Sequence, residues 1–246
     1  MSTSQPRRVS LDPELQTEVI TALKNFYEFL TKLPWLQPDD VLEPPKQGWP
    51  NINTENFAPF QKNEAVIELL KHLPYIRMDG PCHDYKLVWS TYPCDYRRDY
   101  FQIVHPEIGC WEIPDTSARD FKFPEWVVPL TYGKVHGQYI MLDTTDGTAM
   151  SYSAQWLYDP VYGPDDPRAW RNECENPGST ARLGDILNLW KNDYFHLRII
   201  GQASGTEPRL HIESSDAEYK ELRELMLRYG WPDNFDREGC RNAMLE

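Results

Sequence analysis

The first strong hydrophobic pattern lies near the start of the chain and is typical of an amphipathic helix. Asp12 and Pro13 can begin it, because aspartate caps free amide groups of the first turn and proline presets the first helical φ. Apolar residues then recur every three or four positions: Leu15, Val19, Leu23, Phe26, Tyr27 and Leu30. We therefore predict a helix over residues 13–32 that buries this face and stops before Pro34.

Three later stretches repeat the helical spacing. The apolar positions are Val66, Leu69, Leu70 and Leu73 after Asn63; Leu183, Ile186, Leu187, Leu189 and Trp190; and Leu222, Leu225, Met226 and Tyr229. Ser179 or Thr180 can cap the second of these helices, Asp216 can cap the last, and Gly230 can end it. The chain thus predicts helices both before and after its central part.

Residues 123–153 follow a two-residue period, which predicts three antiparallel strands. Trp126 and Leu130 should face the core together with Ile140 and Leu142 of the next strand. Gly133 and Gly137 bracket the first turn, where glycine can adopt a positive φ, and Asp146-Gly147 is typical of a tight second turn. Residues 85–92 and 98–104 are predicted strands, as are the two apolar runs on either side of Gly201.

These elements predict an α+β fold, with a central antiparallel sheet that contains the three-stranded meander and is flanked by N-terminal and C-terminal helices. Residues 1–10 are expected to be a disordered arm, 11–60 a helix followed by a proline-rich segment that wraps over the domain, and 61–246 the α+β domain. Residues 11–246 should form one compact unit, because the six prolines of 34–60 stand among apolar aromatic anchors.

The chain has 246 residues and a formal net charge of −13. Such an acidic surface repels phosphates, so nucleic acid and anionic membranes are disfavoured partners. No apolar run reaches the roughly 18 residues of a membrane span, and the first ten residues lack a signal-peptide core. The five cysteines are scattered and predicted to be reduced thiols. These features favour a cytoplasmic protein.

No group of residues carries a clear catalytic or metal-binding pattern. Cys82, His83, Cys94, His105 and Cys110 lie close in sequence but lack the short paired spacing of zinc ligands. Ser204 follows Gly201 in a G-x-x-S-G run, which is more typical of a hairpin turn than of a nucleophile. Asp143 and Asp146 miss the spacing of a calcium loop. We therefore predict neither an enzyme nor a cofactor or metal site.

The most distinctive irregular segment is an acidic, proline-rich and aromatic stretch over residues 157–178, here called the insertion. Tyr158, Tyr162 and Trp170 could anchor a partner, and Asp165 and Asp166 could belong to a rim of carboxylates that steers a basic protein. The alternative is that the insertion simply packs over the sheet as part of the core.

The strand pair Trp126–Leu130 and Gly137–Asp143 resembles the central hairpin of the SUKH superfamily, which contains fungal cell-wall-synthesis regulators and bacterial toxin-immunity proteins. The likeness extends from Val66–Leu70 to Leu183–Leu187, and residues 229–235 with Cys240 are similar to the ending of fungal members. Gln138 and the length of the insertion depart from the family pattern.

The resemblance implies a non-catalytic, cytoplasmic module for protein–protein interaction. In a fungus, such a module would link signalling to cell-wall synthesis. One alternative is an immunity-type inhibitor of a basic toxin or nuclease, which suits the acidic charge. The other is an enzyme whose site the sequence does not reveal.

Overall fold

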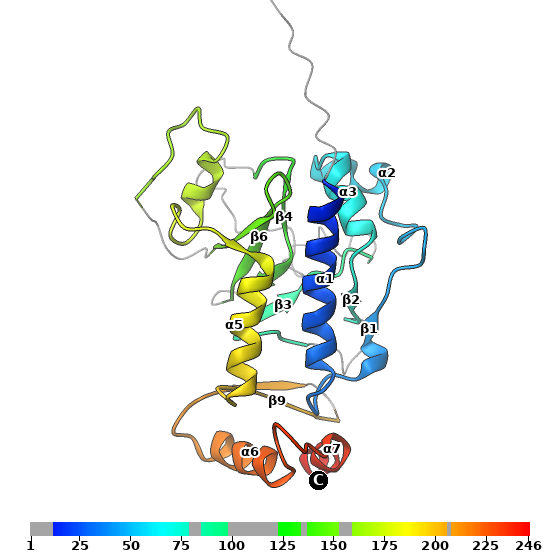
Figure 1. Cartoon of the computed structure of the whole chain (residues 1–246), viewed down its shortest axis with the longest axis vertical. Coiled ribbons are helices and arrows are strands. Elements are labelled where there is room, and N and C mark those ends of the chain that lie inside the picture. Colours follow the sequence, from blue (N-terminus) through cyan, green and yellow to red (C-terminus); the bar gives the residue numbers. More distant parts are fainter. Residues whose placement is uncertain (1–11, 79–84, 98–122, 134–136, 153–158, 206–207) are drawn as a thin grey trace, which may run out of the picture.

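The computed structural model describes residues 12–78, 85–97, 123–133, 137–152, 159–205 and 208–246. The fold is α+β, as predicted: helices surround several small antiparallel sheets. Helices α1 (Pro13–Leu30) and α5 (Leu183–Phe195) lie side by side along the length of the molecule (Figure 1). The predicted arm and the predicted strand 98–104 lie outside the described residues.

The remaining helices and strands are short. The helices are α2 (Thr54–Phe57), α3 (Glu64–Lys71), α6 (Ala217–Arg228) and α7 (Arg237–Leu245), with 3-10 turns η1 (Pro38–Asp40), η2 (Ala58–Phe60) and η4 (Ala169–Glu173). The strands are β1 (Val41–Leu42), β2 (Tyr75–Ile76), β3 (Thr91–Pro93), β4 (Val127–Pro129), β5 (Thr131–Gly133), β6 (Tyr139–Asp143), β7 (Thr148–Tyr152), β8 (Ala181–Arg182), β9 (Ile199–Gln202) and β10 (Arg209–Ile212).

The helical spacing of the sequence predicts the first helix well. The Asp12 side chain accepts a hydrogen bond from the Glu14 amide, and all six predicted apolar residues of α1 are buried. Helix α3 begins as expected after Asn63, whose side chain accepts from the Val66 amide. These two caps satisfy amide groups that a first helical turn leaves free.

Two features near the other helices differ from the prediction. Helix α5 is preceded by Arg182 and not by Ser179 or Thr180, because Ala181 and Arg182 first pair with β7 as the edge strand β8. Helix α6 begins after Asp216 as predicted, but it is followed by another helix, α7, which we did not predict. Asp236 caps α7 by accepting from the Gly239 amide.

The predicted meander is present in a four-stranded antiparallel sheet with the order β4-β6-β7-β8. Gly147, in the β6–β7 turn, has a φ of +70° and donates its amide to the Asp143 carbonyl. Strands β9 and β10 pair as predicted, but Gly201 lies within β9 opposite Leu210, and only Ser204 lies in the connection. Asp146 and Gly147 thus lie in the β6–β7 turn as predicted, but four residues separate Asp143 from Thr148, so the turn is longer than a two-residue hairpin turn.

The single strand predicted over 126–132 is divided between two sheets. Strand β4 pairs with β6, whereas β5 pairs with β3, and Thr131 lies at the crossing. Its hydroxyl donates to the Gln138 carbonyl and accepts from the Ile140 amide, which replaces two backbone bonds of the ladder. Both faces of 127–131 are buried, so the alternation did not mark one core face, and Trp126 is only partly buried.

Two further turns also depart from the sequence prediction. The predicted strand 85–92 contains a tight turn at Trp89 and Ser90, and only Thr91–Pro93 is a strand. Gly133 and Gly137 have no positive φ. Instead a Cβ at Gly133 would overlap the Gly137 backbone, and a Cβ at Gly137 would overlap both Gly133 and the Ser90 carbonyl oxygen. Glycine is needed here for its size.

The proline-rich segment 34–60 packs against the core through its aromatic side chains. Trp35 is 1% exposed and lies over Gly201 of β9, while Phe57 packs against Tyr96. Trp49 is partly buried and donates to the Leu73 carbonyl. The segment therefore belongs to the same core as the sheet and the helices.

Helix α7 closes the molecule by binding the end of α1. The Arg237 guanidinium donates to the carbonyls of Thr31, Leu33 and Leu36, and Arg241 donates to those of Pro34 and Trp35. These carbonyls follow the last turn of α1, where helical partners are missing. Two arginines thus join segments that lie about 200 residues apart in the sequence.

Candidate functional site

The insertion projects from the body of the molecule beside the four-stranded sheet, and it is the yellow-green segment at the upper left of Figure 1. The structure describes it from residue 159 onward. It contains η4 and otherwise lacks regular structure. In its described part it has no strand ladder of its own, so side-chain contacts and local backbone bonds hold its shape.

Arg171 of η4 fastens the insertion to the sheet. One terminal nitrogen, Nη2, lies 3.1 Å from Asp143 Oδ2, 2.7 Å from Asp146 Oδ2 and 3.2 Å from the Thr148 hydroxyl. The side chains of Arg171 and Asp143 are 6% and 3% exposed, whereas that of Asp146 is 44% exposed. The two aspartates of the β6–β7 turn thus hold a cation supplied by the insertion.

Hydrogen bonds and ion pairs in this cluster compensate for the hydration that its carboxylates lose on burial. Burial alone raises the pKa of Asp146, but hydrogen bonds from Thr148 and Arg171 outweigh it, so the pKa lies below its ordinary value. Asp143 also accepts from the amide and hydroxyl of Thr145, at 2.9 and 2.5 Å. Asp143 and Asp146 therefore bind Arg171 and turn groups, as structural carboxylates.

A second set of contacts shapes the outer part of the insertion. The Asn172 side chain accepts from the amides of Val161 and Tyr162 and donates to the Tyr162 carbonyl. The Glu175 amide donates to the Ser151 carbonyl of β7, at 2.8 Å. The loop is thereby fixed at its outer bend and at its return to the sheet.

The outer surface combines an apolar residue with a stacked aromatic and charged pair. Val161 is 59% exposed. The Arg168 guanidinium lies 4.6 Å from the centre of the Tyr162 ring and binds both carboxylate oxygens of Asp166, at 3.0 and 2.9 Å. The bonds from Arg168 lower the pKa of Asp166 to about 2, so this pair stays charged at any physiological pH.

The structure separates the five residues predicted to bind a partner. Tyr158 lies outside the described residues. Tyr162 is half-buried and sits with Asp166 on the outer face, and Asp165 is exposed. Trp170 is 2% exposed and packs on Phe123, with ring centres 6.0 Å apart. The insertion thus has an outer surface that includes Tyr162 and a core contact through Trp170, and the prediction that it binds a partner stays a prediction.

Several exposed apolar residues were not singled out from the sequence, among them Val161 and Trp89. Val161 lies within the insertion, and Trp89, 55% exposed, lies at the tip of the turn before β3. The Thr91 hydroxyl donates to the Trp89 carbonyl and fixes that turn. The exposure of Trp89 was not predicted, because the apolar run 85–92 was interpreted as one strand and contains no signal for a turn.

The candidate metal residues give little further information. Cys94 is buried, and Cys82, His83, His105 and Cys110 lie outside the described residues. Within the described ranges, no three His, Cys, Asp or Glu side chains are grouped as metal ligands would be.

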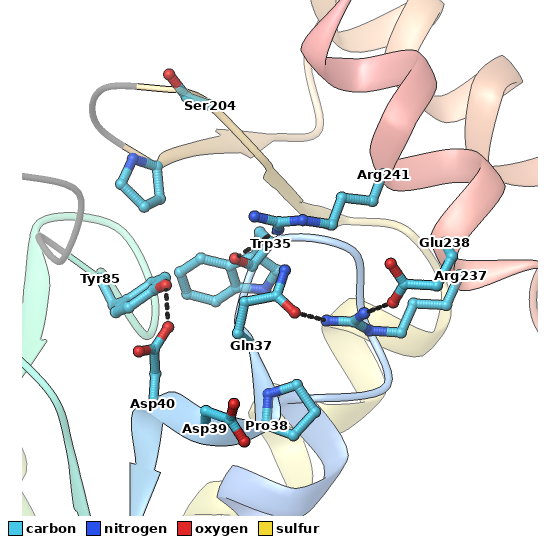
Figure 2. A pocket seen from close by; sticks show the side chains of 11 residues that line it. Trp35, Gln37, Pro38, Asp39, Asp40, Tyr85, Ser204, Arg237, Glu238 and Arg241 are labelled. Carbon is cyan, nitrogen blue, oxygen red and sulfur yellow. Dashed lines mark hydrogen bonds and ion pairs between the residues drawn. The ribbon is translucent and has the colours of Figure 1, made fainter.

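A pocket of about 580 Å³ lies between the end of α1, the β9–β10 hairpin and α7 (Figure 2). Tyr85 donates to Asp40 on one side, at 2.6 Å, and Arg237 and Arg241 lie on the other. Both guanidinium groups bind backbone carbonyls, and Arg237 also pairs with Glu238. The two arginines of the pocket therefore join α7 to the segment that follows α1.

Comparisons with protein-family models, with curated proteins and with solved structures gave no match for this chain. None of the helices in the described part combines the length and apolar character that a membrane crossing needs.

Proposed function

We propose that this protein is a non-catalytic interaction module of the cytoplasm that binds a protein partner through the outer face of the insertion. The observation that carries the proposal is a projecting loop whose shape is fixed by Arg171 and Asn172 while Val161 stays 59% exposed. A loop that is already ordered loses less entropy on binding, so more of its contact energy contributes to affinity.

The charge of this surface favours a basic partner. Asp159 and Asp165 are exposed beside Val161 and Tyr162, while the two arginines of the insertion are already paired with carboxylates. Unpaired carboxylates around an apolar contact would steer a positively charged surface toward it. The sequence resemblance described above extends the proposal to a role that links signalling with cell-wall synthesis in a fungus.

The net charge of −13 favours a second candidate, an immunity-type inhibitor of a basic toxin or nuclease. Such a complex would use the same acidic face, but its partner would be an enzyme. Inhibition of a copurified nuclease by the purified chain would support this candidate over a signalling role.

Quantitative affinity capture tests the proposal. Wild-type protein and a Val161→Ser, Tyr162→Ser variant are used to capture partners from a fungal lysate, and the captured proteins are compared by mass spectrometry. The control is Leu189→Ser, because Leu189 is 66% exposed on α5 and lies outside the insertion. We expect a protein that the control retains and the double variant loses about tenfold. Equal capture by both variants would contradict the proposal.

A further inference from the structure

A groove of about 380 Å³ lies at the C-terminal end of the molecule, between α6, α7 and Gln202 of β9. In Figure 1, α6 and α7 lie at the end of the molecule opposite the insertion. The groove is therefore a separate surface, and the inference drawn from it does not depend on the proposed function.

The floor of the groove is apolar. Leu222 is 6% exposed, and Leu225 and Met244 are partly buried against the core. Methionine adapts its flexible side chain to different neighbours, a property common at surfaces that bind peptides. The floor can therefore accept one or two apolar side chains from another molecule.

The rim of the groove is acidic. Glu218, Glu221 and Glu224 line it from α6 and are exposed, against one guanidinium, that of Arg228. Glu218 forms an ion pair with Arg209, in which Glu218 Oε1 lies 3.6 Å from Arg209 Nη1. Within the described chain, Glu221 and Glu224 have no ion-pair partner.

We infer that this groove docks a basic segment of a protein partner, in which one or two apolar side chains are flanked by lysine or arginine. The apolar floor supplies the contact area, and the unpaired carboxylates supply complementary charge. Glu218 and Arg228 are ten residues apart on α6, so the groove runs about 15 Å, the length of a three-turn helix.

Fluorescence anisotropy with a labelled peptide tests this inference. The probe is a helical peptide of about 12 residues in which leucine occupies one face and lysine the other. A second peptide replaces the leucines with serine and keeps the charge. The full chain is titrated against both probes at low and at physiological ionic strength.

The decisive variant is Glu221→Lys, Glu224→Lys, and its matched control is Asp159→Lys, Asp165→Lys. Both change the net charge equally, but the control alters the insertion. We expect the groove variant to raise the Kd for the leucine peptide about tenfold and the control to change it less than twofold. Circular dichroism and thermal melting show that each variant is folded.

Two results would overturn the inference. Equal loss of affinity in both variants would mean that peptide binding depends on the net charge of the protein and not on the groove. Equal affinity of the leucine and serine peptides would mean that the apolar floor is not used. A Met244→Gln variant gives an independent check on the apolar floor. We expect it to raise the Kd for the leucine peptide severalfold without changing how the Kd depends on ionic strength.

Discussion

Replacing Arg171 by methionine should destabilise the protein strongly, because Asp143 would keep a buried charge without its cation. Removing one partner of a buried ion pair typically costs about 3–5 kcal/mol. Asp146 can return to water, since its side chain is 44% exposed, and Asp143 keeps its two bonds from Thr145. We therefore expect a loss near the lower limit, about 3 kcal/mol.

The measurement is urea unfolding, in which the free energy of unfolding follows from the midpoint and slope of the transition. For a chain of this length the same loss lowers the melting temperature by roughly 6–12 °C. The control is the double variant Asp143→Asn, Arg171→Met, which removes both buried charges and should recover about 1–2 kcal/mol relative to Arg171→Met alone.

The ion pair between Arg171 and Asp146 should make the stability of the protein sensitive to acid. The pKa of Asp146 is below its ordinary value in the folded state, so its contribution to stability is complete above that ordinary value and is lost as the pH falls through the folded pKa. Arg171→Met should therefore lose less stability than wild type as the pH falls below 3.8, the ordinary pKa of aspartate. A loss below 1 kcal/mol at neutral pH, or no recovery in the double variant, would refute the reasoning.

Three further outcomes are expected. Trp170→Ala should cost about 3–5 kcal/mol in urea unfolding because it leaves a cavity beside Phe123; a loss under 1 kcal/mol would mean that Trp170 is not core. Gly137→Ala should lower the melting temperature by several degrees, since its Cβ would overlap the Ser90 carbonyl, whereas Gly163→Ala, which meets no atom within 4 Å, should change it little. Chelator should leave the melting temperature unchanged, and a drop of several degrees would instead indicate a structural metal.

The parts of the fold that the sequence predicted depend on local signals. All six core residues of α1 follow from helical spacing, and Asp146-Gly147 predicted the place of the β6–β7 turn. Both signals reside within a few neighbouring residues, and no distant contact opposes them. The α+β class followed from the order of these elements.

The errors arose where distant contacts decide the structure. Whether 126–132 is one strand or two depends on Thr131, whose hydroxyl bonds with Gln138 and Ile140 of a different segment. The alternation there was uninformative because both faces are covered.

The candidate site shows the same division. The sequence identified the insertion by its composition, but composition cannot separate Arg168, paired on the surface, from Arg171, buried against Asp143. Likewise the sequence does not distinguish Tyr162, which is half-buried on the outer face, from Trp170, which is buried in the core. An irregular segment has no period, so its inner and outer residues cannot be assigned from the sequence.

The two arginines of α7 have a consequence for how the chain acquires its structure during synthesis. Five carbonyls after α1 gain their arginine partners only once Arg237 and Arg241 have been synthesised: those of Thr31, Leu33, Pro34, Trp35 and Leu36. Until then the first helix has formed its local bonds, but the turn after it is incomplete. Contacts of such long sequence separation slow folding and leave a nascent chain open to chaperones and proteases. The segment after α1 therefore completes its backbone hydrogen bonds only through long-range contacts that α7 supplies.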